Sequence, residues 1–281
     1  MLRYATSCYT WKDLLIPRYI TIDESIRWTA ALGFDGYEIT NLTDSWMDVP
    51  FDLNSMRRTA NECGIVIPSW AMAADWSLGI RCQADKAKNE MDMAQVLGVR
   101  VFRTDTYVAE TAAPYADEVI DAVRELADYA AARGMQLVTE NHGTFLCTPE
   151  RLLPLFEKVN HPNFGLLYDG ANFAASDSDP LEAAKLLAPL VRHVHMKDAH
   201  LKPGTRLFPG KGWQKTLKGN YWRCAITGQG TVPYEEILPV LLKAGFDGWL
   251  VQEFDGIEDP VEAMCEGFDY SKRLAASLKA E

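Results

Sequence analysis

The chain has 281 residues, of which 48% are hydrophobic, and its formal net charge is −11. This length and composition suit one large folded domain or two small ones. The acidic charge argues against nucleic acid as a partner, because binding it without sequence specificity needs a positive face. No apolar stretch is long enough to span a bilayer, so no membrane partner is expected either.

The N-terminus and the cysteines point to a cytoplasmic protein. The first residues, MLRYATSCYTW, lack a basic region followed by an apolar run, so no secretory signal is visible. The cysteines are scattered without a C-x-x-C pair, which favours reduced thiols. They are Cys8, Cys63, Cys82, Cys147, Cys224 and Cys265.

Short apolar runs rich in β-branched or aromatic residues recur about every thirty residues and predict strands. In chain order they lie near residues 3, 33, 64, 98, 135, 163, 191 and 248. Helical patterns fill the intervals. TIDE at 21–24 has the form of a capping box, and its helix is expected to stop at Gly33. Four later helical segments also end on glycine just before the next strand.

Eight strands alternating with about eight helices over roughly 250 residues are typical of a closed (β/α)8 TIM barrel. The competing α/β fold is a doubly wound open sheet, but no G-x-G-x-x-G follows the first strand. No linker or low-complexity segment divides the chain. We therefore predict a single TIM-barrel domain over residues 1–281.

The interval between the seventh and eighth strands is nearly twice as long as the others, and it predicts a long loop after strand seven. Such a loop lies on the catalytic face of a barrel, where it is a candidate lid or oligomer contact. Between residues 199 and 234 there is no acidic residue. The loop either closes over a phosphate or carboxylate of the substrate or packs on the acidic face of a second subunit. The basic residues of this interval are Lys202, Arg206, Lys211, Lys215, Lys218 and Arg223.

Polar residues end four consecutive predicted strands. Glu140, Asp169, His195 and Glu253 lie at or near the ends of strands five to eight. In a barrel these ends form one rim, so the four side chains should meet at a single mouth. Three carboxylates that close would repel each other in a site of low dielectric, and a divalent cation relieves the repulsion. Oxygen ligands with one nitrogen favour Mn²⁺ or Mg²⁺, with Co²⁺ or Zn²⁺ as alternatives.

The period of two residues along a strand brings further polar side chains to the same mouth. His142 and Lys197 each follow a predicted metal ligand by two residues, and Arg103 on strand four points to the same interior. A lysine inside a barrel mouth costs desolvation unless it has an anionic or metal-linked partner. We therefore interpret Lys197 as a substrate-binding cation, although it could merely neutralise Asp198.

Other residues near the mouth have two interpretations each. Asn172 either contacts substrate or caps the helix after strand six. Glu38 either contacts substrate or pairs with Arg103, and Trp70 either lines the pocket or packs in the core. His193 lies one layer deeper than the metal site and is interpreted as a buried, hydrogen-bonded histidine rather than a ligand.

At these residues the sequence resembles the xylose-isomerase-like TIM-barrel superfamily of sugar isomerases and epimerases. The resemblance covers nearly the whole chain, from GFDGYEI through LVTENH, LLYDGANF and HVHMKD to GQGTVPYEEIL and VQEF. In the ketose 3-epimerases of this superfamily, the matching positions bind a divalent metal and the two glutamates exchange the substrate proton. The resemblance thus implies that Glu140 and Glu253 form the acid–base pair, with Asp169 and His195 completing the metal site.

The motifs around the metal depart from the epimerase pattern. Asn172 stands where those enzymes have a histidine, and HMKD stands where they tend toward H-x-G-E. The pairing of His142 with Lys197 is instead similar to the dehydratase branches, which act on inosose or 3-dehydroshikimate. Endonuclease IV also belongs to the superfamily, but its three-zinc site needs many more histidines than the five present here.

Three functions are therefore considered. We place first a metal-dependent isomerase or epimerase of a sugar or related hydroxy-ketone, in which the two glutamates move a proton through a metal-stabilised enediolate. The second is a lyase of the inosose or dehydroshikimate dehydratase kind, in which His142 or Lys197 helps a β-hydroxyl to leave. The third, a non-catalytic sugar-binding barrel, is disfavoured by an intact metal set.

Overall fold

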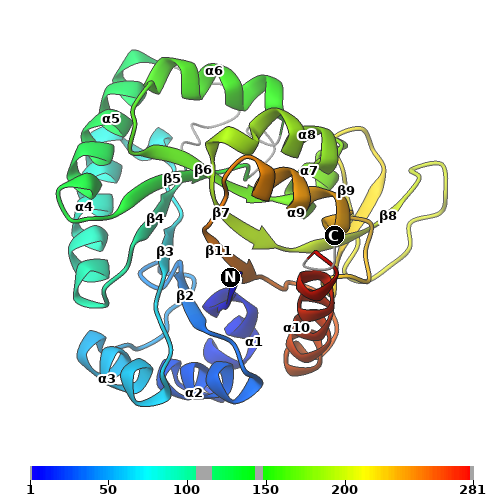
Figure 1. The fold of residues 1–281 in the computed structure, drawn as a ribbon, viewed down its shortest axis with the longest axis horizontal. Helices are drawn as coiled ribbons and strands as arrows, with labels where there is room; N and C mark the ends of the chain where they lie inside the picture. The colour runs from blue at the N-terminus through cyan, green and yellow to red at the C-terminus, as the bar shows by residue number, and fades with distance from the viewer. Residues whose placement is uncertain (1, 106–115, 143–147, 279–281) are drawn as a thin grey trace.

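The computed structural model describes residues 2–105, 116–142 and 148–278. Within these residues, eight parallel strands close into a barrel surrounded by helices (Figure 1), so the predicted (β/α)8 barrel is confirmed. Around the barrel the strands follow the order β1-β11-β7-β6-β5-β4-β3-β2. Their bounds are β1 (Arg3–Ser7), β2 (Gly36–Thr40), β3 (Ser69–Met72), β4 (Val101–Thr104), β5 (Gln136–Glu140), β6 (Phe164–Asp169), β7 (Val191–Met196) and β11 (Trp249–Gln252).

The helices begin and end where local sequence signals place them. Helix α2 (Ile22–Leu32) opens with the capping box of Thr21 and Glu24 and ends at Gly33, whose φ of 91° only glycine adopts readily. The other helices are α1 (Lys12–Leu15), α3 (Leu53–Cys63), α4 (Ile80–Val96), α5 (Asp117–Ala131), α6 (Pro149–Val159), α7 (Gly170–Ala175), α8 (Pro180–Leu187), α9 (Tyr234–Lys243) and α10 (Pro260–Ser277). Short 3-10 turns are η1 (Cys8–Trp11), η2 (Trp76–Leu78) and η3 (Ala188–Leu190).

The floor of the barrel is apolar. Trp249 packs there with Ala5 and Val251 in a small buried cluster. A Cβ at Gly36 would lie 2.7 Å from the Trp249 ring, so glycine at this position leaves room for the indole. This packing closes the end of the barrel opposite the polar mouth.

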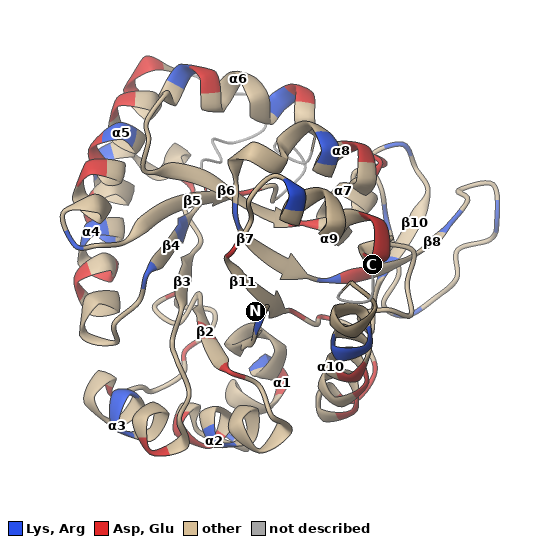
Figure 2. Cartoon of the chain, viewed as in Figure 1, with Lys and Arg blue, Asp and Glu red and all other residues tan. Residues whose placement is uncertain are grey.

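The segment after β7 is more ordered than the predicted loop. It forms a three-stranded antiparallel sheet of β8 (Asp198–Lys202), β9 (Gln214–Lys215) and β10 (Tyr221–Ala225), in the order β8-β10-β9. We call residues 198–225 the arm. It projects from the barrel, and Figure 2 marks Lys and Arg positions along it in blue. Asp198 ties its base to the barrel by accepting hydrogen bonds from the backbone of Gly228, Gly230 and Val232 at 2.9–3.0 Å.

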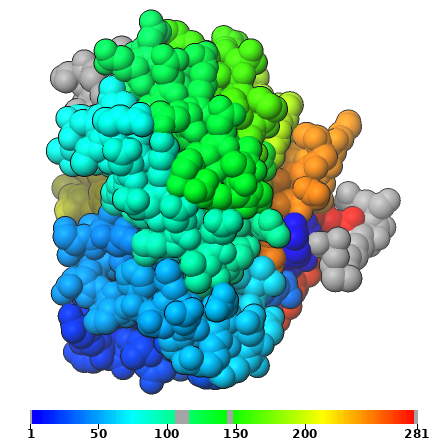
Figure 3. All heavy atoms as spheres, turned by 90° about the vertical axis from the view of Figure 1, so that its left-hand side faces the viewer, coloured from blue at the N-terminus to red at the C-terminus, as the bar shows by residue number. Residues whose placement is uncertain are grey.

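The side of the molecule at the left of Figure 1 is built from the first half of the chain. Figure 3 shows this side as a solid surface, on which blue, cyan and green segments follow one another in chain order. Successive strand–helix units are thus neighbours in space, as short right-handed connections require.

Two expectations about the chain's environment can be compared with the structure. None of the helices in the described ranges is long and apolar enough to cross a membrane. Cys8, Cys63, Cys82, Cys224 and Cys265 are free thiols. Cys147 lies outside the described residues.

Candidate metal centre and active site

The four predicted ligands meet at the mouth of the barrel. The Nδ1 atom of His195 lies 3.4 Å from Oε1 of Glu140 and 3.3 Å from Oε2 of Glu253. Glu140, Asp169 and His195 each offer one ligand atom, and these atoms lie within 4.8 Å of one another. All four side chains are buried. The strand ends therefore deliver three carboxylates and one imidazole to one small volume.

Two atoms in this volume have unsatisfied hydrogen-bonding capacity. Within the described residues, Oδ2 of Asp169 and Nδ1 of His195 are buried without a hydrogen-bond partner. Buried polar atoms are seldom left so, because the loss of hydration is costly. Burial raises the pKa of Asp169 to about 7, with Glu140 and Glu253 adding to the rise and Lys197 opposing it. A divalent cation would accept a lone pair from each of the two atoms and neutralise the excess negative charge, so the donor set fits a metal ion.

Asp169 has two separate tasks, one for each carboxylate oxygen. Its Oδ1 accepts a hydrogen bond from the backbone N–H of Asn172 at 2.9 Å and caps helix α7. Its Oδ2 is the unsatisfied atom that faces the metal site. The cap thereby orients the carboxylate toward the site.

Glu38 supports the site from beneath. Its Oε1 lies 3.0 Å from Nε2 of His195, and its Oε2 lies 3.0 Å from Nε2 of His193. Because the carboxylate accepts from Nε2, the Nδ1 of His195 is directed at the metal site, an arrangement common for metal-bound histidines. Burial would raise the pKa of Glu38, but His195 and His193 outweigh it and hold that pKa well below its usual value.

The position of Glu38 differs from both contacts expected for it. The side chain is fully buried and leaves no surface for a substrate, and its partners are the two histidines rather than Arg103. His193 is, as predicted, a buried histidine with a hydrogen bond. We therefore assign Glu38 a supporting role.

Trp70 faces away from the barrel interior. Its neighbour Ser69 points inward and donates to Glu38, and successive side chains on a strand alternate between faces. The Trp70 indole consequently lies in the helix layer, fully buried, where its Nε1 donates to Glu90 of α4 at 2.7 Å. This position corresponds to the core interpretation of Trp70, and we do not include the residue in the pocket.

Glu140 and Glu253 are each paired with a different basic side chain. Arg103 contacts Oε2 of Glu140 at 2.9 Å, and Lys197 donates to Oε1 of Glu253 at 2.6 Å. Burial would raise the pKa of Glu140, but Arg103 and His195 outweigh it and lower that pKa. Burial would lower the pKa of Lys197, but Glu253 and then Asp169 outweigh it and raise that pKa well above its usual value. Lys197 is therefore an ammonium ion next to Glu253.

The predicted residues Asn172 and His142 also reach the mouth. Asn172 donates from Nδ2 to Oε1 of Glu140 at 3.0 Å, so it positions a predicted metal ligand. Nδ1 of His142 lies 3.5 Å from Oδ2 of Asp105, and the imidazole is half exposed. Desolvation would lower the pKa of His142, but the Asp105 carboxylate outweighs it and raises that pKa. Protonated His142 is thus available as an acid.

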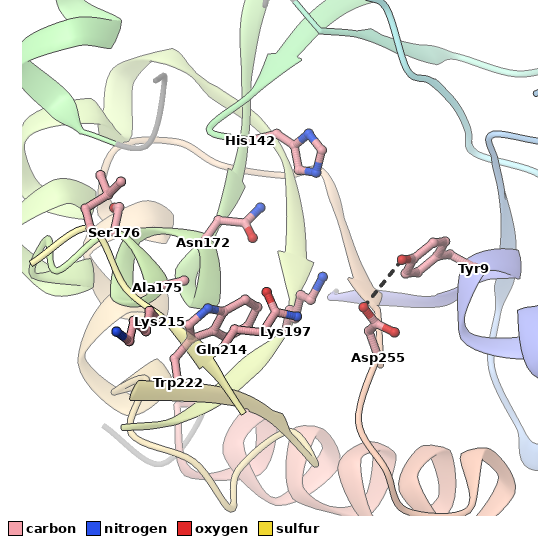
Figure 4. Close-up of a pocket in the computed structure, with 11 residues that line it drawn as sticks. Tyr9, His142, Asn172, Ala175, Ser176, Lys197, Gln214, Lys215, Trp222 and Asp255 are labelled. Atoms are coloured by element: carbon pink, nitrogen blue, oxygen red, sulfur yellow. Dashed lines mark hydrogen bonds between the residues drawn. The ribbon is translucent and has the colours of Figure 1, made fainter. Parts of the chain in front are cut away.

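A cavity of about 310 Å³ lies beside these groups, between the barrel mouth and the arm (Figure 4). On one side, Tyr9 donates a hydrogen bond to Asp255, and on the other, arm residues form the wall. The lining residues include Tyr9, His142, Asn172, Lys197, Gln214, Lys215, Trp222 and Asp255. Tyr9, Trp222, Asp255 and Asp105 were not predicted from the sequence. Asp105 and Asp255 had a usable signal, since they follow Arg103 and Glu253 by two residues each.

Known proteins of similar sequence include sugar-processing enzymes. A sequence model of the xylose isomerase-like TIM barrel family matches residues 26–274. An inosose dehydratase from Geobacillus thermodenitrificans (strain NG80-2) is 26% identical over 278 residues, covering 92% of this chain and 89% of that protein. Further inosose dehydratases align over about half of their length.

Solved structures share the fold at low sequence identity. The probable 3-DHS dehydratase AsbF from Bacillus anthracis matches with a TM-score of 0.74 at 18% identity, over 96% of this chain and 99% of that one. A D-psicose 3-epimerase from Clostridium cellulolyticum H10, solved with D-tagatose, matches with a TM-score of 0.72 at 15% identity, over 97% and 99%. A TIM barrel protein from Mycobacterium smegmatis in complex with magnesium matches with a TM-score of 0.73 at 20% identity, over 99% and 97%.

The family model spans most of the chain, and the barrel that names the family agrees with the closed barrel described above. This protein belongs to the xylose isomerase-like TIM barrel family.

Proposed function

We propose that this protein is a metal-dependent lyase that removes water from a small polyhydroxy ketone of the inosose type. The observation that carries this proposal is the unequal pairing of the two glutamates, Glu140 with Arg103 and Glu253 with Lys197. The similarity to an inosose dehydratase over nearly the whole chain supports the same reaction. From the sequence alone, the lyase ranked second. With these observations we rank it above the isomerase or epimerase.

The unequal pairing limits which glutamate can move a proton. An effective general base has a pKa near the working pH. The pKa of Glu140 is lowered, and the oxygen not facing His195 is bound to a guanidinium that does not give up its proton. Glu140 is therefore suited to ligating a cation and is a poor base. One base, Glu253, and one acid, His142, are what an elimination requires.

The metal would be held by Glu140, Asp169, His195 and Glu253. When bound, a divalent cation supplies Lewis-acid polarisation of the substrate carbonyl and an adjacent hydroxyl. The oxygen-rich set supports Mn²⁺ or Mg²⁺, with Co²⁺ and Zn²⁺ as competitors that metal analysis of the purified protein distinguishes.

The protein side chains would perform the elimination in two proton transfers. Glu253 takes the proton from the carbon next to the carbonyl, while the Lys197 ammonium beside it holds the negative charge that this transfer leaves on the substrate. The electrons of the broken C–H bond form a C=C bond as the C–O bond to the β-hydroxyl breaks. Protonated His142 gives its proton to the departing oxygen, which leaves as water. Because the carbon that lost its proton carries a hydroxyl, the product is an enol. It becomes a diketone by taking up a proton at carbon from solvent and releasing its hydroxyl proton to solvent.

One observation favours a second candidate, an epimerase or isomerase. Glu140 and Glu253 lie almost equally far from Nδ1 of His195, at 3.4 and 3.3 Å, as a pair of bases on opposite sides of a substrate would. The shared fold with a D-psicose 3-epimerase is compatible with this alternative. In that reaction the substrate keeps its formula, whereas a lyase product is lighter by one water.

The test is mass spectrometry of substrate panels in D₂O with Mn²⁺-loaded protein. The panel holds inosose, 3-dehydroshikimate and free and phosphorylated ketoses. We expect loss of water from a cyclic ketone, abolished in Glu253→Gln. His142→Asn should lower elimination by about 10²–10⁴-fold while leaving deuterium exchange at the carbon next to the carbonyl. His161→Asn, which removes a histidine paired with Asp128 outside the site, is the matched control.

The outcomes of this test separate the candidates. Deuterium gain with a change of configuration, and without loss of water, would replace the lyase by an epimerase. Equal loss of exchange and elimination in His142→Asn would remove the assigned role of His142 as the acid. The free thiols support the cytoplasmic location predicted from the sequence, which cell fractionation would check.

A further inference from the structure

The tip of the arm exposes large apolar side chains. Leu207 is 93% exposed and Phe208 is 58% exposed. Among the described residues, the Phe208 ring contacts one aromatic ring, that of Tyr221, edge to face at a centroid distance of 5.6 Å. Contiguous apolar side chains exposed at the end of a projecting element mark an interaction surface.

The arm also has a charge opposite to that of the rest of the molecule. Residues 199–234 carry six basic and no acidic residues, so the remainder of the chain has a net charge of −11 minus 6, or −17. At the tip, Arg206 and Lys211 form no ion pair within the part of the chain that the structure describes. Their charges remain available to an acidic partner surface.

A hollow with an aromatic wall and two carboxylates at its edge lies on the same chain, beside helix α10. A hollow of about 200 Å³ is bounded by the turn at residues 227–229 and by Glu266, Asp269, Tyr270 and Arg273. Tyr270 supplies an aromatic wall, and exposed Glu266 and Asp269 supply acidic groups at its edge. Arg273 is the opposing charge, and Lys272 pairs with Asp269 at 2.6 Å. In Figures 1 and 2, both α10 and the arm lie at the right of the molecule.

We propose that the arm is a dimerisation element, whose tip docks on the α10 hollow of a second copy of this chain. Leu207 and Phe208 would enter the hollow beside Tyr270 of the second copy, while Arg206 and Lys211 face Glu266 and Asp269 at its edge. A twofold axis makes the contact reciprocal, so each arm docks on the other copy and two such contacts close the dimer. The inference does not depend on the proposed reaction.

The charge distribution favours a second copy over an anionic lipid surface as the occupant. A basic tip with exposed Leu and Phe side chains could also insert into a membrane. An anionic membrane would, however, repel the remaining charge of −17, whereas a second copy presents that charge to the arm. Vesicle binding is therefore kept as an opposing outcome of the test.

Docking would also steady part of the active-site wall. Gln214, Lys215 and Trp222 of the arm line the cavity at the barrel mouth. The arm is held to its own barrel by Asp177, which accepts from the backbone N–H of Lys218 at 2.6 Å and from Asn220 at 2.8 Å. These contacts hold the turn between β9 and β10 to the barrel and leave residues 206–211 to the second copy.

The first experiment is sedimentation equilibrium of the full-length protein. We expect a dimer of twice the 31.5 kDa chain mass. Leu207→Glu with Phe208→Glu should lose the dimer without loss of thermal stability, because both side chains are exposed in the single chain. Tyr19→Glu, at a distant residue that is 76% exposed, is the matched control and should remain dimeric. A wild-type monomer at all concentrations would overturn the proposal.

The second experiment identifies both surfaces by exchanging their charges. One variant carries Arg206→Glu and Lys211→Glu, and the other carries Glu266→Lys and Asp269→Lys. Each alone should be monomeric, because like charges face each other, and an equimolar mixture should form a heterodimer in which both contacts are again opposite in charge. Failure of the mixture to associate would overturn the docking site. Co-sedimentation of the wild type with phosphatidylserine vesicles, lost in the Leu207→Glu, Phe208→Glu variant, would assign the arm to a membrane instead.

Discussion

Glu38→Gln should weaken metal binding although Glu38 itself is not a proposed ligand. The carboxylate accepts from two histidines at once, at 3.0 Å each, and also from Ser69 at 2.7 Å. Glutamine keeps the shape but can accept at only one oxygen. Its amide N–H₂ would face the Nε2 atom of either His193 or His195, and two donors cannot share that contact.

The magnitude follows from the role of such supporting carboxylates. Loss of the outer partner of a metal-bound histidine typically costs about 10–100-fold in metal affinity. That range corresponds to about 1.4–2.8 kcal/mol. We expect the upper part of it, because Glu38 is fully buried and no water can take over its contact with His195.

Isothermal titration calorimetry with Mn²⁺ measures this loss, and circular dichroism checks that the variant is folded. The matched control is Glu90→Gln, which changes another buried glutamate, one that is hydrogen-bonded to Trp70 and Thr43 outside the site. Its metal affinity should equal that of the wild type. If folded Glu38→Gln also binds Mn²⁺ as tightly as the wild type, or if Glu90→Gln loses as much, the orienting role of Glu38 is wrong.

Four further predictions rest on the same structure. Removal of the metal by a chelator should lower the melting temperature, because metal at a hundred times its Kd adds about 2.7 kcal/mol to the free energy of unfolding. That corresponds to roughly 5–10 °C in a thermal-shift assay. Identical melting curves with and without metal would contradict the proposed metal site. Metal affinity should rise with pH through the pKa of Asp169 at about 7, because a proton and the cation compete for the same carboxylate. Calorimetry in buffers of different ionisation enthalpy should detect the proton released on metal binding. A pH-independent affinity would contradict this prediction. Lys197→Met should lower turnover by about 10²–10⁴-fold with the metal content unchanged, whereas Lys202→Met on the arm should leave both unchanged. Gly36→Ala should destabilise the fold by about 1–3 kcal/mol in urea unfolding, because its Cβ would press on Trp249; wild-type stability would show that the barrel floor adapts.

The barrel, and the meeting of four polar side chains at its mouth, could be predicted because both depend on local pattern. Each strand is a short apolar run, and parallel strands in a closed barrel bring their C-terminal ends to one rim. Glu140, Asp169, His195 and Glu253 follow directly from that rule. Their roles in ligation and catalysis remain predictions, which the variants above examine.

Contacts across the barrel interior could not be predicted from the same pattern. Glu38 on β2 reaches His193 and His195 on β7, and β2 and β7 are not neighbours in the sheet. Strand order determines which strands lie side by side, but the reach of side chains across the interior depends on their rotamers and packing. The face of Trp70 was ambiguous for another reason, since β3 begins only at Ser69 after Pro68 and its alternation covers few residues.

The pairing of the two glutamates with Arg103 and Lys197, in contrast, follows from strand order alone. Arg103 lies on β4 beside β5, which carries Glu140, and Lys197 follows β7, which pairs with β11 just before Glu253. We expect exchange of the two cations to move proton acceptance from Glu253 towards Glu140, because a guanidinium is a rigid planar donor whereas an ammonium is a point charge on a flexible stem. In the proposed mechanism, the cation on the neighbouring strand would select which of the two glutamates acts as the base. In this chain that position belongs to Glu253, on the side of the mouth where the arm forms the wall of the cavity.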